Sequence, residues 1–231
     1  MDGKIRKSMK KIILLVAVVI VSTASFAQIS IGLQATGNLS TANFKAEEGY
    51  DFKKKMKAMP GAGVVVQYRV NENWAVRSGV NYLKQGVKAT ANVDAWGDEP
   101  PFTAKIESDL NYLQVPLNAV YTIPVSKLQF FAGAGFFLNY GLSGKMKVEN
   151  KATFPDGTES VYKEERDAFK DEDEEGGGLK RTDFGIGALA GVQFNKLFIN
   201  VGYQIGLSDA IKEGDGKYKQ RGLQLSVGYW F

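Results

Sequence analysis

The last ten residues of the chain, 222–231, alternate without a break between apolar side chains and polar or small ones. Because successive side chains of a β-strand point to opposite faces, this period of two predicts a strand with one apolar face. The apolar face would carry Leu223, Leu225, Val227, Tyr229 and Phe231, and the other face Gly222, Gln224, Ser226, Gly228 and Trp230. A strand of this kind has an apolar environment on one side and a polar or tightly packed one on the other.

Seven earlier segments show the same alternation and are also predicted to be strands. They span residues 28–37, 60–70, 74–85, 109–121, 128–142, 182–194 and 197–207. Strands of about ten residues are long enough to cross a bilayer at a tilt of ~45°. The sequence therefore predicts an all-β protein of eight antiparallel strands.

The connections between these strands alternate strictly between short and long. Short connections are expected at 71–73, 122–127 and 195–196, and long ones at 38–59, 86–108, 143–181 and 208–220. An even-stranded outer-membrane barrel has short periplasmic turns and long extracellular loops, with both termini in the periplasm. The alternation favours an up-and-down transmembrane β-barrel of this kind.

The composition of the two strand faces distinguishes a membrane barrel from a soluble one. A soluble eight-stranded barrel would show a charged face to water, whereas the non-apolar face here is mostly Gly, Gln, Asn and Ser. Glycine suits a crowded interior better than a water-facing strand. Aromatic residues near strand ends on the apolar face predict two interfacial girdles: Tyr68, Trp74, Tyr121, Phe130, Tyr140, Phe194, Tyr229 and Phe231.

The N-terminus has the layout of a secretory signal peptide. A basic region, an apolar core over residues 12–21 and small residues before Gln28 predict cleavage after Ala27. The alternative, a membrane-anchoring helix, requires about 20 apolar residues, and this core is shorter. We therefore expect residues 1–27 to be removed and residues 28–231 to form a single outer-membrane barrel domain, with either Met1 or Met9 as the start.

Charge and residue inventory exclude several functions. Without residues 1–27 the chain has 24 basic and 24 acidic residues, so its basic pI gives no support for nucleic-acid binding. Cysteine and histidine are absent, which argues against zinc sites, against most activated nucleophiles and against the His-dependent enzymes known on barrels. We predict no catalytic residue, no metal site and no cofactor.

Several polar residues fall on the lumen-facing parity of the predicted strands. Arg69 and Arg77 would lie near the periplasmic end and Asp183 near the extracellular end. Since buried charges need partners, we predict a polar network that plugs the barrel, formed by Arg69, Arg77, Gln114, Asn139, Asp183 and Gln204. Pro116 cannot donate to a strand ladder, so we expect a β-bulge there.

Two predicted loops carry opposite charge and are candidate interaction sites. Lys53, Lys54, Lys55 and Lys57 could pair with the acidic third loop or bind lipopolysaccharide phosphates. The third loop carries an unbroken acidic run, which is typical of a solvated mobile loop but could also bind calcium or a basic partner. This run consists of Asp171, Glu172, Asp173, Glu174 and Glu175.

Several segments are similar to the PorT-like outer-membrane β-barrel domain family. They are residues 37–40, the Tyr-Leu-x-x-Pro-Leu strand at 112–117, and residues 137–141, 183–185 and 191–194. The terminal strand, ending at Phe231, resembles the strand that the barrel-insertion machinery reads. The resemblance implies an eight-stranded barrel in the outer membrane and, from the member that gave the family its name, a link to protein secretion. Gln114 and Val120 stand where the family often has an acid and a lysine.

These patterns predict a non-enzymatic outer-membrane barrel whose surface loops support envelope integrity or bind an unknown protein partner. Outer-membrane lipid and lipopolysaccharide would surround it. One alternative is an accessory subunit of a secretion or envelope-assembly system. Another is a narrow channel, which would need a water path past Gln67, Asn81, Gln114, Asn139 and Gln204.

Overall fold

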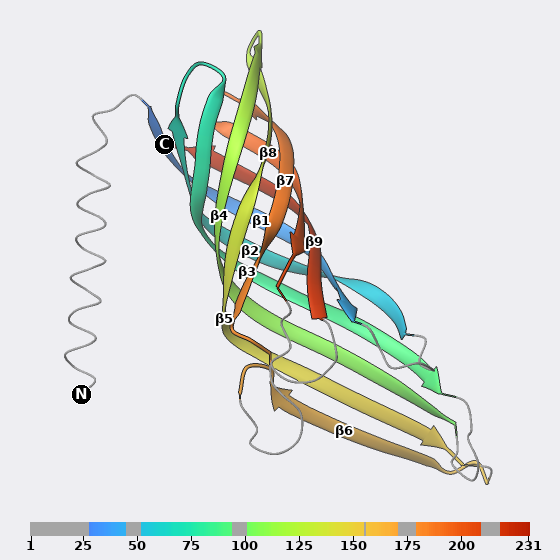
Figure 1. Ribbon diagram of the computed structural model, residues 1–231. Coiled ribbons are helices and arrows are strands. Elements are labelled where there is room, and N and C mark those ends of the chain that lie inside the picture. The colour runs from blue at the N-terminus through green and yellow to red at the C-terminus, as the bar shows by residue number, and fades with distance from the viewer. Residues whose placement is uncertain (1–27, 45–51, 94–100, 155, 171–178, 209–217) are drawn as a thin grey trace, which may run out of the picture.

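The computed structural model describes residues 28–44, 52–93, 101–154, 156–170, 179–208 and 218–231 (Figure 1). The predicted signal peptide and the acidic run at 171–175 lie outside these residues. Within them the chain forms nine strands: β1 (Ile29–Phe44), β2 (Phe52–Arg69), β3 (Trp74–Val93), β4 (Phe102–Val125), β5 (Leu128–Thr153), β6 (Glu159–Asp167), β7 (Thr182–Phe194), β8 (Leu197–Gly206) and β9 (Tyr218–Trp230).

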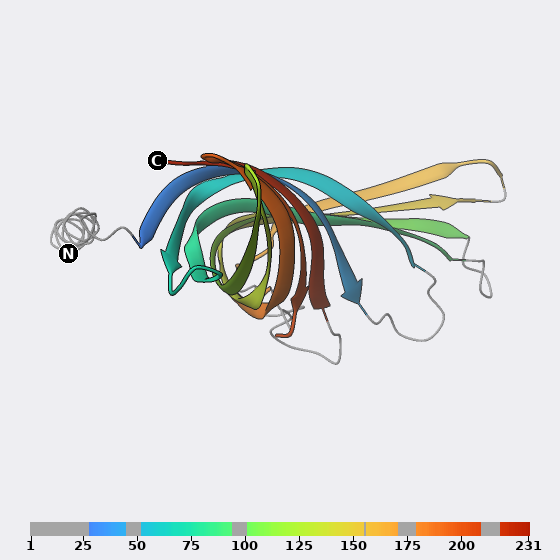
Figure 2. The same cartoon turned by 90° about the horizontal axis from the view of Figure 1, so that it is seen from above.

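Eight of these strands form a closed antiparallel ring, which confirms the predicted fold class. Neighbours run in the order β4-β3-β2-β1-β9-β8-β7-β5, and pairing between β4 and β5 closes the ring. Seen from above, the ribbon encloses a central lumen (Figure 2). We call the end with the three short turns the turn end and the opposite end the loop end. No helix in the described residues has the length and hydropathy needed to cross a bilayer.

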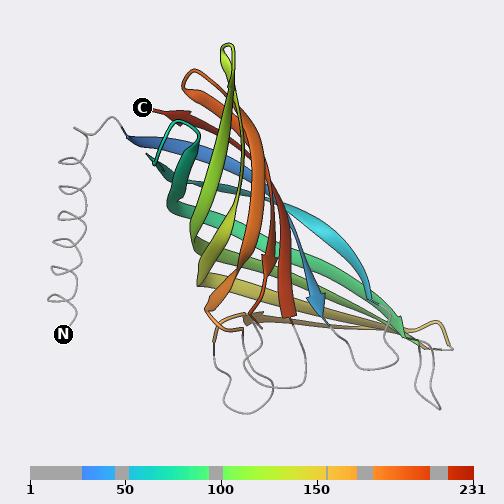
Figure 3. The ribbon, with the colours of Figure 1, turned by 45° about the horizontal axis from the view of Figure 1, so that its top comes forward.

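The strands at the loop end are longer than predicted. Pairing between β3 and β4 continues to Val93 and Phe102, and β5 continues to Thr153, where it pairs with the added strand β6. The predicted loops at 38–59, 86–108 and 143–181 were therefore wrong in their bounds, because much of each is strand. We call β6 and the loop-end parts of β2 to β5 the distal sheet, which projects beyond the ends of β1 and β9 (Figures 1 and 3).

The predicted facing of the barrel strands is confirmed. The apolar face points outward around the ring, and the predicted girdle aromatics are exposed on it. Polar and small residues point into the lumen, where Gln114 is only 1% exposed. At the turn end, β4 and β5 are joined by a tight turn at Ser126 and Lys127, and β7 and β8 by one at Asn195 and Lys196; Ser126 and Asn195 adopt positive φ values of 56° and 53°.

The predicted bulge at Pro116 was wrong. The β3–β4 register is the same on either side of it, with Ser78 opposite Leu117 and Asn81 opposite Gln114. The Ser78 hydroxyl donates to the Pro116 carbonyl (2.7 Å), which satisfies that acceptor within an unshifted register. A bulge occurs instead in β5, where Leu142 lies between the partners of Asn111 and Tyr112.

Candidate functional site

A network of amide side chains crosses the middle of the lumen. Gln114 Nε2 donates to Asn139 Oδ1 and to Gln204 Oε1, both at 2.9 Å. Asn139 Nδ2 in turn donates to Asp183 Oδ2 (3.2 Å), and the Ser208 hydroxyl donates to the other carboxylate oxygen. The structure thus joins four of the six predicted lumen residues, contributed by β4, β5, β7 and β8.

Arg77 lies in a separate layer nearer the turn end. Its Nε and Nη2 both donate to Gln67 Oε1 (2.9 and 2.7 Å), and its guanidinium carbon lies 4.4 Å from the Phe131 ring centroid. The rings of Phe198 and Trp230 lie 5.5 and 5.4 Å away. Together with Val65 and Val120 these rings form a packed cluster. An arginine held by cation–π contacts therefore sits within an apolar seal at the turn end.

A second apolar cluster closes the lumen at the loop end. It contains Phe169, which is 2% exposed, and Leu179, both from the connection between β6 and β7. Phe169 meets the Tyr112 ring edge-to-face with centroids 5.8 Å apart. Leu179 N–H donates to the Ala168 carbonyl (2.7 Å), which ties the two ends of this connection together. The chain after β6 thus folds back into the mouth of the barrel.

Two glycines of β5 form the socket for Phe169. A Cβ at Gly141 would lie 2.4 Å from Phe169 Cζ, and one at Gly144 would lie 2.9 Å from Phe169 Cε2. Arg181 lies against the same ring and donates from Nη1 to the Gly141 carbonyl (3.1 Å). The socket lies beside the Leu142 bulge. On the barrel side of this bulge β5 pairs with β7, and on the distal side it pairs with β6.

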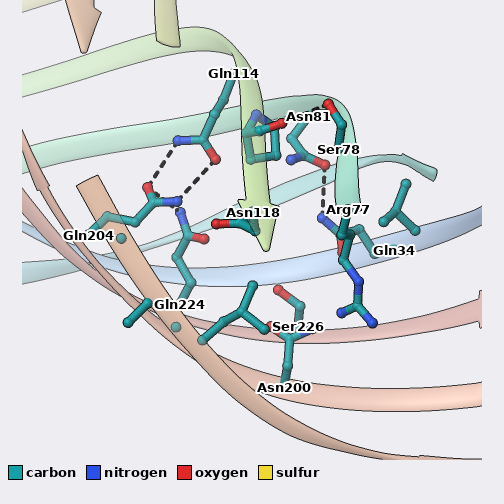
Figure 4. A pocket seen from close by; sticks show the side chains of 16 residues that line it. Gln34, Arg77, Ser78, Asn81, Gln114, Asn118, Asn200, Gln204, Gln224 and Ser226 are labelled. Carbon is teal, nitrogen blue, oxygen red and sulfur yellow. Dashed lines mark hydrogen bonds between the residues drawn. The ribbon is translucent and has the colours of Figure 1, made fainter. Parts of the chain in front are cut away.

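A small polar chamber lies between the two seals (Figure 4). Its volume is about 60 Å³, and since one water needs roughly 10–15 Å³ measured in this way, it holds a few waters and no open pore. Arg77, Asn81, Asn118, Asn200 and Gln204 are among its lining residues. In the described residues this small chamber lies between the two apolar clusters, which narrow the lumen on either side of it.

The remaining predicted site residues do not belong to the network. Arg69 is exposed beside the turn-end mouth, so its assignment to the buried network was wrong. Lys53, Lys54 and Lys55 were expected in a loop but lie on β2, and Lys55 is exposed. Lys57 crosses from β2 to β4, where it pairs with Glu107 (2.6 Å) and with Asp109. The acidic run at 171–175 lies outside the described residues.

Cross-strand ion pairs cover the outer face of the distal sheet. Glu107 also meets Lys88, Glu149 meets Lys105 and Lys163, and Glu165 meets Lys145 and Lys147. Hydrogen bonds from these lysines lower the pKa of all three glutamate carboxyls, that of Glu107 chiefly through Lys57. Basic and acidic groups alternate across the strands, so this surface is highly charged without a dominant sign.

Sequence reasoning missed the residues that close the lumen. Trp230, Phe131 and Phe198 have inward parity in their strands, and an aromatic residue on that polar face was the signal that could have indicated a seal. Phe169 carried a weaker signal, as an aromatic residue in a charge-rich segment that was predicted to be a loop. Among the described residues no cluster of three or more metal-ligating side chains was found.

Comparisons with known proteins place this architecture in context. The sequence model for the outer membrane protein beta-barrel domain matches residues 26–212. Curated proteins gave no match. Solved structures similar to the chain include OprG of Pseudomonas aeruginosa, at 12% identity and a TM-score of 0.48, covering 89% of this chain and 96% of that one.

Two further structures resemble the chain at lower TM-scores. Neisserial surface protein A is 13% identical, with a TM-score of 0.42 and coverage of 88% of this chain and 97% of that one. Ail of Yersinia pestis, solved with the heparin analogue sucrose octasulfate, is 18% identical, with a TM-score of 0.39 and coverage of 88% and 98%. At these identities and scores no ligand or activity transfers to this chain.

Proposed function

We propose, from the premise that this chain belongs to the outer membrane protein beta-barrel domain family, that it acts as a non-enzymatic, non-conducting barrel with a binding surface outside the cell. Membership of this family means that the chain resides in the outer membrane. By the usual orientation of such barrels, the turn end faces the periplasm and the distal sheet faces outward.

The observation that carries this proposal is the lumen closed at both ends. Phe169 and Leu179 pack into the outer mouth, and the aromatic rings around Arg77 fill the periplasmic end. Arg77 and Asp183 are the charged side chains among the buried described residues, and they lie in different layers. An acid–base pair for catalysis would need two such groups within hydrogen-bond reach of one substrate.

The distal sheet supports a role outside the membrane. Five strands project past the apolar band, and their outer face carries the alternating lysine and glutamate pairs. A rigid sheet presents these groups in fixed positions, which favours recognition over the mobile loops expected from the sequence. Lipopolysaccharide phosphates or a charged protein surface are the partners that this chemistry fits.

Delivery to the membrane completes the proposal. A signal peptide at 1–27 would direct export, and residues 28–231 would form the mature domain. The terminal strand, with its outward Tyr229 and Phe231, would be the segment that the barrel-insertion machinery binds. These steps rest on the sequence patterns, and replacement of Phe231 by Ser with unchanged assembly in cells would contradict the second.

A second candidate is an accessory subunit of a secretion or envelope assembly, suggested by the PorT-like segments. The most specific of these, 112–117, belongs to β4 and turns Tyr112 and Gln114 into the lumen. Gln220 Nε2 donates to the Tyr112 hydroxyl (2.9 Å). The motif therefore has a structural role here, and the assembly function would depend on surfaces elsewhere.

The test is crosslinking in cells with a hairpin-shortened variant. Residues 146–166 are replaced by a two-residue Asn-Gly turn between Lys145 and Asp167, which are paired in the β5–β6 ladder. This change shortens the distal sheet but keeps Phe169. We expect a partner or lipopolysaccharide captured by the wild type to be lost in the variant.

Single-channel recording on both proteins provides the second readout. We expect no current from either, because both retain the two seals. Steady currents through the wild type would overturn the proposal in favour of the narrow channel. Identical captured partners in both proteins would move the interaction to the periplasmic turns and favour the assembly subunit.

A further inference from the structure

The chamber between the two seals contains a buried cation without an anion. Arg77 is 6% exposed and lies within the lumen wall. No carboxylate pairs with it among the described residues: Asp183 bonds instead to Asn139 and Ser208, at the other end of the amide network. Removing a charge from water without a counter-charge is costly. The question is what balances this guanidinium.

The protein satisfies only part of the guanidinium. Of its five N–H donors, the one on Nε and one on Nη2 are directed to the single acceptor Gln67 Oε1. Nη1 has no acceptor in the described part of the chain. The aromatic rings of Phe131, Phe198 and Trp230 stabilise positive charge through their faces, but they accept no conventional hydrogen bond.

Two neutral amides that line the same chamber as Arg77 are also unpartnered among the described residues. Asn118 is its register partner on β4, and Asn200 comes from β8 on the far side of the chamber. Neither side-chain amide is hydrogen-bonded within the described residues. Ser226, the register partner of Asn200, adds a hydroxyl to the same wall; this hydroxyl is bonded to that of Thr36 (2.9 Å) and can still donate its own hydrogen if Thr36 donates to it. Figure 4 shows Arg77, Asn200 and Ser226 at one end of the chamber.

From these observations we propose that the chamber binds a small inorganic anion of halide size, held by Arg77 and the donor groups of Asn118, Asn200 and Ser226. Chloride is the abundant member of this class. The volume of about 60 Å³ accommodates one such ion with a few waters. A larger organic acid does not fit. The anion neutralises the buried guanidinium and accepts hydrogen bonds from the N–H groups that have no acceptor in the described part of the protein.

The turn end is the side from which an anion would have the shorter way to Arg77, past the aromatic rings. A polar mouth of about 440 Å³ at the turn end is lined by Gln67 and Arg69 among others. Gln67 forms the link between this mouth and Arg77, since it lines the one and bonds to the other. Arg69 and Glu72 both line this mouth, so their opposite charges offset each other there.

Bromide serves as the probe for the position of the site. Crystals of the wild-type protein grown in bromide should show an anomalous peak in the chamber beside the Arg77 guanidinium. This measurement needs no variant, so it decides the matter even if substitutions at Arg77 prevent folding. Absence of a peak in the chamber would mean that only water fills it, and the proposal would be wrong.

Thermal unfolding in detergent tests whether the site matters at ordinary concentrations. Chloride is exchanged for gluconate at constant ionic strength, and the wild-type Tm should rise with chloride because a ligand that binds only the folded state stabilises it. Arg77→Met should abolish that rise. Arg69→Met is the matched control, since it removes an exposed arginine of the same mouth, and it should retain the rise.

A second variant keeps the charge but fills the chamber. Asn200→Leu removes a proposed ligand and occupies its space, and it should also lose the chloride-dependent rise in Tm. An equal wild-type Tm in chloride and gluconate would overturn the proposal, even with a bromide peak, since the peak would then reflect an adventitious ion only. If the Tm of Arg77→Met depends on chloride as much as the wild-type Tm does, the proposal is also overturned, because chloride would then act at the protein surface.

Discussion

The two halves of β4 expose the same face to different surroundings. Toward the turn end its outward residues are Leu113, Val115 and Leu117, and all are exposed. In the distal sheet the same parity carries Lys105, Glu107 and Asp109, which take part in ion pairs. The backbone continues without a break, so the change of residue type marks where lipid ends and water begins.

The inward faces of the same strands change in the opposite sense. Inside the barrel, β3 and β4 present Asn81, Gln114 and Arg77, whereas in the distal sheet they present Val87, Ala89 and Leu110. In the barrel the apolar environment lies outside, and in the distal sheet the apolar packing lies inside. Each segment therefore places its apolar residues on the side where lipid or packed side chains lie, and that side changes along one continuous strand.

The largest expected effect comes from the contact that joins the two regions. Phe169→Ala removes the ring that fills the Gly141–Gly144 socket. Loss of a buried phenylalanine costs about 3–5 kcal/mol, because a cavity remains. We expect unfolding in urea at a clearly lower midpoint. Phe154→Ala, which changes an exposed phenylalanine of the distal connection, should leave the midpoint unchanged, and an equal loss in both would contradict the seal.

The second largest effect is expected from a charge on the lipid-facing surface of the barrel. Leu117 is 54% exposed on the outward face of β4, so Leu117→Arg places a charge against lipid at a cost of about 2–4 kcal/mol. Folding into vesicles, followed by gel mobility with and without heating, measures it. Thr103→Arg on the same face of the distal sheet serves as the control, and it should fold normally. Equal tolerance of both would mean that Leu117 does not face the bilayer.

A smaller effect is expected from the ion pairs of Lys57, which lie where the barrel continues into the distal sheet. Lys57→Met leaves Glu107 and Asp109 without the lysine that bridges them, and Lys57 is the most buried of the paired lysines. We expect a loss of about 1 kcal/mol, near the upper end for partly exposed pairs. Equilibrium denaturation compares it with Lys105→Met, whose exposed pair should contribute nothing measurable. A reversed order would refute the bridging role.

The smallest effect is the response of the distal sheet to acid. Ion pairing lowers the carboxyl pKa of Glu149 and Glu165 below 4.5 in the folded state. Their contribution is therefore complete above pH 4.5 and is lost as the pH falls through the lowered folded values. Amide hydrogen exchange, corrected for intrinsic rates, should show faster opening of β5 and β6 there than of β7 and β8.

The matched control for this acid response is Glu149→Gln, which cannot titrate. Its distal sheet should show a weaker dependence on pH over the same interval and should already open faster at neutral pH. Uniform acceleration in the barrel and the distal sheet would show that the ion pairs do not govern the response.

Much of the barrel was predictable because its physics is local. The period of two along each strand, the small residues inside and the aromatics at the strand ends follow from the side chains alone. The distal sheet escaped prediction because its strands alternate charged residues with small or mixed ones, as in 102–109. The inner face of this segment is apolar only in part, with Phe102, Ala104 and Ile106 beside Ser108, and pairing with the neighbouring strands completes its β-structure.

The candidate site was partly predictable for the same reason. Parity alone indicated that Gln114, Asn139, Asp183 and Gln204 face the lumen, but not that hydrogen bonds would join them. Arg69 has the same parity and yet is exposed, because β2 ends there and the mouth opens. Parity gives the side of a strand and not the depth along it.

The sequence by itself determined the eight barrel strands, the facing of their side chains and the membrane-crossing architecture, because the alternation can be followed residue by residue along each strand. The tertiary structure alone decided that β3, β4 and β5 continue into the distal sheet, that Phe169 closes the outer mouth and that Arg77 is enclosed by three rings. Each of these depends on contacts between residues distant in the chain, which only closure of the ring brings together.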